Sequence, residues 1–236
     1  MHKFSPSTVK SIAENFETFV DAASNIAKQF HSSDTTGHDW WHVWRVWNLA
    51  KHIAQREGAN ILEVELAALL HDMDDHKIDG ADGENLPNAR KTLLQLNVDA
   101  ELVEKVIGII KQVSFKGANV DTTPSSLEAC VVQDADRLDA IGAIGVARAF
   151  AYGGSKNREI YNPEEKPTLH GSFEDYKSSK GSTLNHFYEK LLLLKDKLNT
   201  NTAKEIAIER HSYMVRFVEQ FLDEWNLKDI EHRQRL

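Results

Sequence analysis

The chain has 236 residues, of which 41% are apolar and 27% charged, a composition that is ordinary for a globular protein. Its net charge of −8 argues against a nucleic-acid binder, because such proteins carry a basic surface that displaces counterions. No apolar run approaches the roughly 18 residues of a membrane span, and the opening MHKFSPSTVK lacks the apolar core of a secretory signal. The single cysteine, Cys130, suits a reducing compartment. We therefore expect a cytoplasmic protein that binds neither nucleic acid nor membrane.

Apolar residues recur at three- and four-residue spacing along most of the chain, which is the periodicity of amphipathic helices. Helices are predicted over residues 9–30, 42–53, 62–70, 100–113, 127–135, 140–152 and 202–225. Asp99 is predicted to cap one of them, and Ser125 with Glu128 and Thr202 with Glu205 have the spacing of capping boxes. Gly153–Gly154 is expected to end a helix. Because period-two segments are nearly absent, the sequence predicts an all-α fold.

We find no repeat and no linker, so a single domain is expected over residues 1–236. Its predicted parts are a helical core over about 37–152, a loop over about 153–181 and C-terminal helices over about 182–226. The loop is polar and contains Gly, Pro and Ser, and loops of this length in compact domains are usually functional or mobile. We therefore expect the loop to be mobile, and its closure over a substrate is a further hypothesis.

Histidines and aspartates occupy helix positions that should be buried. His42 lies on the apolar stripe of its helix, and His71 and Asp72 end the run AALLHD. Downstream, the run VVQDADRLDAIG carries Asp134, Asp136 and Asp139 in an otherwise apolar helix. Burying one unpaired carboxylate costs several kcal/mol, so several such groups in one small domain call for a common partner. A divalent cation is that partner.

Imidazoles mixed with carboxylates suit transition-metal ions better than Mg²⁺. We expect one divalent metal ion, with Mn²⁺ favoured and Fe²⁺, Co²⁺, Ni²⁺, Zn²⁺ or Mg²⁺ as alternatives. A second ion would need further ligands, for which His38, Asp75 and His76 are the candidates. A metal ion of this kind activates water and neutralises phosphoryl charge, which predicts a hydrolase.

The series HVWRV, LLHD and DADRLDAIG resembles the H…HD…D signature of the HD-domain metal-dependent phosphohydrolase superfamily, and particularly its small bacterial nucleotide pyrophosphohydrolases. The resemblance runs from about Gly37 to the last helix and includes NHFYEKLL. It implies a helical bundle with the metal site between central helices and the ligands His42, His71, Asp72 and Asp136. Apolar periodicity favours Asp134 as the inward residue instead, so Asp134 is left open as a residue that orients a ligand or caps the helix.

The resemblance also implies an acidic residue that assists proton transfer, three positions after the aspartate of the HD pair. That position is Asp75, so Asp72 and Asp75 are the expected catalytic residues. Asp75 is shorter than the glutamate of many relatives, and Asp74 is its rival. A solvated acidic loop is the alternative for both.

Basic residues near these motifs are candidates for holding phosphate. They are Arg45, Lys77, Lys111, Arg137 and Arg148, with Arg210 on the apolar stripe of its own helix. Four tryptophans surround the first histidine, namely Trp40, Trp41, Trp44 and Trp47. Stacking on a base is one interpretation of the tryptophans, and packing in the core is the favoured one.

The predicted activity is cleavage of nucleoside triphosphates, including deoxynucleotides, to a monophosphate and pyrophosphate. The alternatives are an HD-type phosphomonoesterase acting on 5′-nucleotides and a cyclic-nucleotide phosphodiesterase. A non-catalytic nucleotide or metal sensor is the alternative from another class. The expected partner is a small phosphate-bearing substrate, in a protein that is a monomer or a homodimer.

Overall fold

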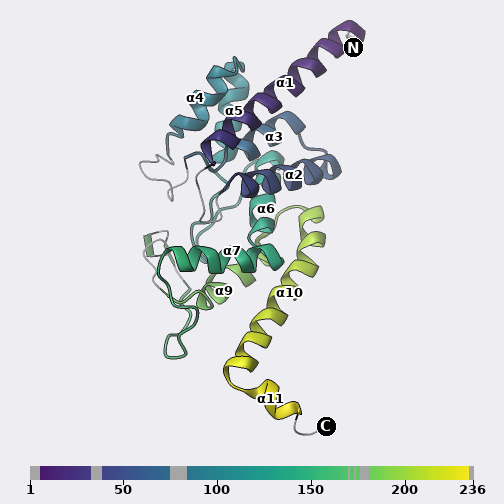
Figure 1. Cartoon of the computed structure of the whole chain (residues 1–236). Helices are drawn as coiled ribbons and strands as arrows, with labels where there is room; N and C mark the ends of the chain where they lie inside the picture. The colour runs from purple at the N-terminus through teal and green to yellow at the C-terminus, as the bar shows by residue number, and fades with distance from the viewer. Residues whose placement is uncertain are drawn as a thin grey trace. The chain divides into compact units, whose positions relative to one another are not determined.

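The computed structural model describes residues 6–32, 39–74, 84–169, 171–172, 174–175 and 181–233. All regular structure in these ranges is helical, which confirms the predicted all-α fold. The helices are α1 (Pro6–Phe30), α2 (Trp40–Glu57), α3 (Ile61–Leu70), α4 (Pro87–Gln95), α5 (Ala100–Ile110), α6 (Leu127–Asp139), α7 (Gly142–Ser155), α9 (Asn185–Glu189), the 3₁₀ helix η1 (Leu191–Lys197), α10 (Asn201–Trp225) and α11 (Lys228–Arg233) (Figure 1). None of these helices has both the length and the apolar character needed to cross a membrane.

The chain forms two compact units. The first comprises Met1–Ser114 and Thr122–Asp136, and the second comprises Phe115–Asp121 and Arg137–Leu236. The first unit therefore contains α1 to α5 with most of α6, and the second contains α7 to α11. The division of the chain into a core, a loop over 153–181 and C-terminal helices stays a prediction.

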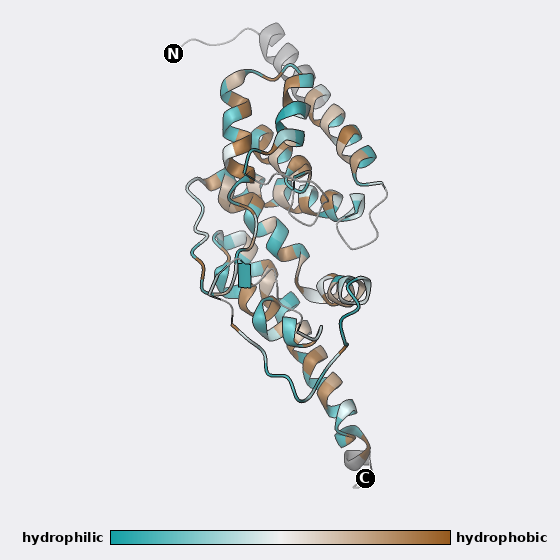
Figure 2. Ribbon diagram, turned by 90° about the vertical axis from the view of Figure 1, so that its left-hand side faces the viewer, coloured by the Kyte–Doolittle hydropathy of each residue, from teal (hydrophilic) through white to brown (hydrophobic). Residues whose placement is uncertain are grey.

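Helix α3 forms the centre of the first unit. Every residue from Val64 to Leu70 is buried, and α3 packs against α1, α2 and α5. Its neighbours are amphipathic, and apolar and polar bands alternate along them in Figure 2. A short helix that is apolar nearly all round is stable only when other helices cover it, as they do here. The residues at its C-terminal end are therefore held inside the unit.

The predicted helix caps are right in one case and displaced in two. Asp99 caps α5 by accepting a hydrogen bond from the Leu102 backbone N–H at 3.0 Å. At α6 the capping side chain is Ser126, whose Oγ accepts from the Ala129 N–H at 3.1 Å, and not Ser125. At α10 it is Thr200, two residues before the predicted Thr202. Several Ser and Thr residues near each start fit a capping pattern, and the direction in which the chain enters the helix selects one of them.

Gly153 and Gly154 do not end α7, which continues to Ser155. Gly153 is buried, and a Cβ atom placed on it would lie 2.1 Å from Thr183 Oγ1. The glycine therefore permits close packing of the helix on the segment at Thr183, and its backbone stays helical. The predicted helix end was wrong because a glycine can serve to make room for a neighbouring segment, and does not always mark the end of a helix.

Candidate metal centre

His42 is placed by the start of α2. Asp39 is the N-cap of this helix, and its Oδ1 accepts a hydrogen bond from the His42 backbone N–H at 2.9 Å. The imidazole is completely buried. The cap fixes the first turn of α2 and so fixes the direction in which the His42 side chain leaves the backbone.

His71 and Asp72 follow the buried helix α3 directly. His71 is the C-cap residue of α3, and its Nδ1 lies 2.9 Å from the Ala68 carbonyl oxygen. Because a carbonyl oxygen only accepts, Nδ1 is the donor, and the neutral ring then has its lone pair on Nε2. Among the described residues this buried Nε2 has no hydrogen-bond partner. Orientation of an imidazole by a backbone carbonyl in this way is the usual arrangement for a metal ligand.

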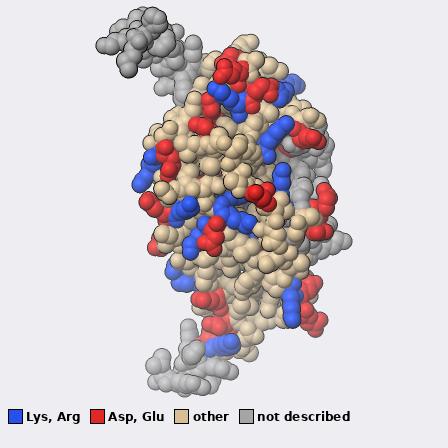
Figure 3. Space-filling view, turned by 180° about the vertical axis from the view of Figure 1, so that it is seen from behind, with Lys and Arg blue, Asp and Glu red and all other residues tan. Residues whose placement is uncertain are grey.

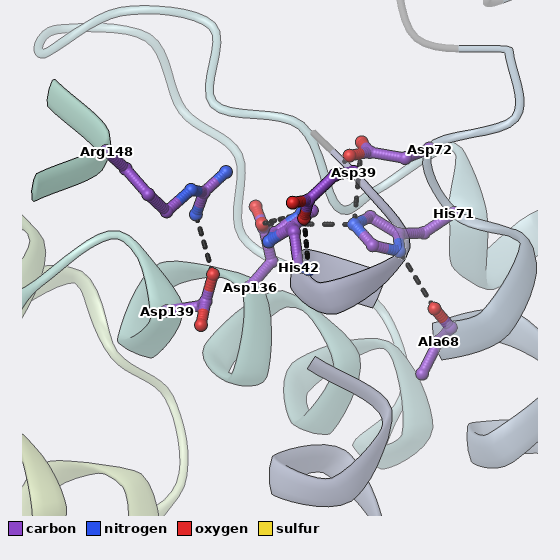
Figure 4. Close-up of polar contacts among 8 residues, drawn as sticks. All are labelled: Asp39, His42, Ala68, His71, Asp72, Asp136, Asp139 and Arg148. Carbon is purple, nitrogen blue, oxygen red and sulfur yellow. Dashed lines mark hydrogen bonds and ion pairs between the residues drawn. The ribbon is translucent and has the colours of Figure 1, made fainter. Parts of the chain in front are cut away.

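Four side chains converge here, from α2, from the end of α3 and from α6 (Figure 4). His42 Nε2 lies 3.1 Å from Asp72 Oδ2 and 3.6 Å from Asp136 Oδ1. His71 Nε2 lies 3.4 Å from Asp72 Oδ1 and 3.9 Å from Asp136 Oδ1. Ligand atoms placed at about 2.1 Å from one ion are about 3 Å apart when adjacent and about 4 Å apart when opposite. The four separations fall within this range, so the cluster is consistent with a divalent metal ion.

The two aspartates of α6 that the sequence left open have different surroundings. Asp136 is the one whose carboxylate lies beside both imidazoles, and its side chain is 27% exposed. Asp134 is completely buried. The apolar periodicity pointed to Asp134 because it indicates which face of α6 is buried, whereas a ligand at an accessible site belongs at the edge of that face. Asp136 is therefore the aspartate of α6 that lies beside the imidazoles, and its role as the fourth ligand stays a prediction.

Asp74 has a role that the sequence did not indicate. Its Oδ1 accepts hydrogen bonds from the Asn88 backbone N–H at 3.1 Å and side-chain Nδ2 at 2.8 Å, and its Oδ2 accepts from the Ala89 N–H at 2.9 Å. The carboxylate thereby caps α4, whose own N-cap residue Leu86 makes no side-chain cap. A carboxylate held on both oxygens by α4 is poorly suited to proton transfer. Its rival Asp75 lies outside the described residues, as do His38, His76 and Lys77.

The predicted phosphate-binding residues have separate environments. Within the second unit, buried Arg137 donates to the Lys197 carbonyl oxygen, and Arg148 donates to Asp139 Oδ2 at 2.8 Å. In the first unit, Lys111 is exposed at the end of α5, and Arg45 is partly exposed on α2. A role for any of them in phosphate binding stays a prediction. Figure 3 shows acidic and basic side chains interspersed on one face of the protein.

The tryptophans divide between core and surface. Trp40 is buried, which agrees with core packing. Trp41 and Trp44 are 59% and 42% exposed and contact each other edge to face, with ring centroids 6.2 Å apart. Core packing was therefore the wrong expectation for these two.

Trp47 donates from Nε1 to Glu65 Oε1 at 3.0 Å, so a buried glutamate inside α3 was missed by sequence reasoning. The signal for it was an acidic residue within the apolar run of 64–70.

The helical fold and its cluster of two histidines and two aspartates fit the HD-domain superfamily that the sequence motifs resemble. Comparison with known proteins points to the same family. The HD domain family matches residues 40–141, which contain all four clustered residues. YpgQ of Bacillus subtilis is 40% identical over 190 residues, which are 80% of this chain and 85% of YpgQ. The chain therefore belongs to the HD domain superfamily, among the small bacterial HD-domain proteins similar to YpgQ.

Solved structures of similar proteins extend over nearly the whole chain. A Lactobacillus plantarum protein has a TM-score of 0.81 and 41% identity, covering 89% of this chain and 98% of that one. An HD-superfamily hydrolase from Bacillus thuringiensis has a TM-score of 0.69 and 40% identity, covering 89% and 98%. The structure of Bacillus subtilis YpgQ in complex with ADP has a TM-score of 0.67 and 35% identity, covering 87% and 96%.

Proposed function

We propose that the protein is a Mn²⁺-dependent hydrolase that cleaves nucleoside triphosphates, including deoxynucleotides, to a monophosphate and pyrophosphate. The observation that carries the proposal is the cluster of buried His42, His71 and Asp72 with the partly exposed Asp136, in which the imidazoles lie 3.1 to 3.9 Å from the two carboxylates. The ADP complex of YpgQ supports a nucleotide as the substrate class. The similarity to a Bacillus thuringiensis HD-superfamily hydrolase supports hydrolysis.

His42, His71, Asp72 and Asp136 are the residues that would hold the ion. A bound divalent cation supplies two things in such a site, a lowered pKa for coordinated water and neutralisation of phosphoryl charge. The contribution of this chain is to orient the imidazoles through Asp39 and the Ala68 carbonyl before any ion arrives. Orientation in advance matters because an ion with partly flexible ligands binds more weakly.

The proposed reaction forms a bond between a water oxygen and the α-phosphorus and breaks the bond from the α-phosphorus to the oxygen that bridges to the β-phosphorus. Pyrophosphate leaves with that oxygen, and a base accepts the proton of the water. Asp75 is our candidate for the base, because it follows the HD pair by three positions and Asp74 is held by α4. Arg45 and Lys111 in the first unit, with Arg137 and Arg148 in the second, stay candidates for holding the phosphates.

The test measures orthophosphate and pyrophosphate released from nucleoside mono-, di- and triphosphates and from cyclic nucleotides, with Mn²⁺ and after EDTA. Asp72→Asn is compared with Asp99→Asn, which makes the same chemical change at a helix cap outside the cluster. We expect Mn²⁺-dependent pyrophosphate release from triphosphates that is lost in Asp72→Asn and kept in Asp99→Asn. Orthophosphate from monophosphates would identify a phosphomonoesterase instead. A folded protein that binds Mn²⁺ and nucleotide without turnover would identify a sensor.

A further inference from the structure

One of the buried acidic residues outside the metal cluster lies on α3, the helix that directly precedes His71 and Asp72. Glu65 of α3 is completely buried, and its Oε1 lies 3.0 Å from Trp47 Nε1 and 3.0 Å from Lys51 Nζ, both on α2. Its other oxygen, Oε2, is buried with no hydrogen-bond partner among the described residues. One carboxylate oxygen therefore joins α3 to two successive turns of α2.

The bridge does little for stability by itself. Removing a carboxylate from water is costly, and the cost is not fully recovered when one of its oxygens lacks a donor. Lys51 is 44% exposed, so its charge is largely satisfied by water already. Replacement of such a group by an apolar side chain of similar volume is often neutral or stabilising. Since the bridge contributes little to stability, its main physical effect is on how α2 and α3 are aligned with each other.

That alignment determines the separation of the metal ligands. Asp72 follows Glu65 by seven residues, which corresponds to about 10 Å along a helix axis, and His42 precedes Trp47 by five. A shift of α2 along α3 by one residue would move His42 by about 1.5 Å relative to Asp72. Metal ligands must be held to within about 0.5 Å, so a far smaller shift already weakens binding.

We infer that Glu65 is a positioning residue, whose bridge to Trp47 and Lys51 holds α2 in the register that brings His42 to 3.1 Å from Asp72. The inference rests on the proposed metal site. It predicts that metal affinity and stability respond differently to loss of the bridge. A residue with a purely structural role would change the two together.

The experiment titrates the metal-free protein with Mn²⁺ by calorimetry and measures the urea unfolding of the same samples without metal. Glu65→Met and Lys51→Met each remove one end of the bridge. Glu63→Met is the matched control, because Glu63 is on the same helix but faces Lys105 of α5, with Nζ and Oε1 3.7 Å apart. We expect Glu65→Met to bind Mn²⁺ about tenfold more weakly while keeping its unfolding midpoint. Glu63→Met should bind Mn²⁺ as the wild type does.

Lys51→Met separates positioning from a charge effect through space. Removing a positive charge would strengthen Mn²⁺ binding if charge alone mattered, whereas loss of the bridge should weaken it. The double variant should be no weaker than the weaker single variant, because both act on one interaction. Mn²⁺ binding in Lys51→Met and Glu65→Met equal to or tighter than that of the wild type would overturn the inference. Absence of Mn²⁺ binding by the wild type would instead overturn the proposed function.

Discussion

The carboxylate of Asp74 and the backbone N–H of Asn88 are 3.1 Å apart, and this contact caps α4 from a residue 14 positions earlier in the chain. Leu86, at the N-cap position, has φ of 51° and no side-chain oxygen to offer. The unpaired N–H groups of the first turn are therefore satisfied from the turn that follows the HD pair. The same bonds hold that turn, and with it Asp72, against α4.

Asp74→Ala should destabilise the metal-free protein by about 2–3 kcal/mol, because it leaves buried donors of α4 without an acceptor. The measurement is urea unfolding. Asp99→Ala is the comparison, since it removes an exposed cap at α5 and should cost about 1 kcal/mol. The cap assignment would be wrong if Asp74→Ala were no less stable than Asp99→Ala.

Arg148→Met should lower the free energy of unfolding by about 2–3 kcal/mol in the absence of metal and nucleotide. The reason is that Asp139, with which Arg148 pairs at 2.8 Å, is only 1% exposed in its side chain. Arg90→Met breaks the exposed pair of Arg90 with Glu104 and should cost much less. If Arg148→Met loses nucleotide binding but no stability, then Arg148 serves the substrate and the pair with Asp139 is incidental.

Gly153→Ala and Gly154→Ala should have opposite effects on thermal unfolding. A Cβ atom at Gly153 would lie 2.1 Å from Thr183 Oγ1, whereas a Cβ atom at Gly154 meets nothing within 4 Å. Gly153→Ala should cost about 1–3 kcal/mol through overpacking, and Gly154→Ala should gain up to about 1 kcal/mol through helix propensity. Thr183→Ala should restore part of the loss in Gly153→Ala. Equal melting temperatures for the two single variants would contradict this packing.

His211 should make stability depend on pH. Burial holds the pKa of His211 below its ordinary value of 6.5, and Lys195 lowers it further while Asp196 acts in the opposite direction. The unfolded chain then binds the proton more readily than the folded one, so the contribution of His211 is complete above pH 6.5 and is lost as the pH falls below it. Urea unfolding between pH 5 and 8 should show this loss in the wild type and a smaller one in His211→Gln. Identical pH profiles would exclude the effect.

Features of this protein that depend on neighbours within one or two helical turns were predictable from the sequence. The spacing of apolar residues predicted α1, α2, α3, α5, α6, α7 and α10, although not α4 or α11. The Asp99 cap involves an N–H only three residues away. The order of His42, His71–Asp72 and Asp136 indicated the superfamily, because each motif lies within one segment. Burial of His42 also followed from its place on the apolar stripe of its own helix.

Features that depend on contacts between distant segments were decided by the tertiary structure alone. Gly153 is needed by Thr183, Asp74 is used by α4, and Glu65 is held by α2, and none of these partners lies within one turn of its residue. A periodic pattern reveals that a helix has a buried face, but it does not reveal which segment covers that face or which donors that segment brings. The choice of Asp136 beside the imidazoles has the same origin, because only the crossing of α2, α3 and α6 determines which carboxylate reaches them.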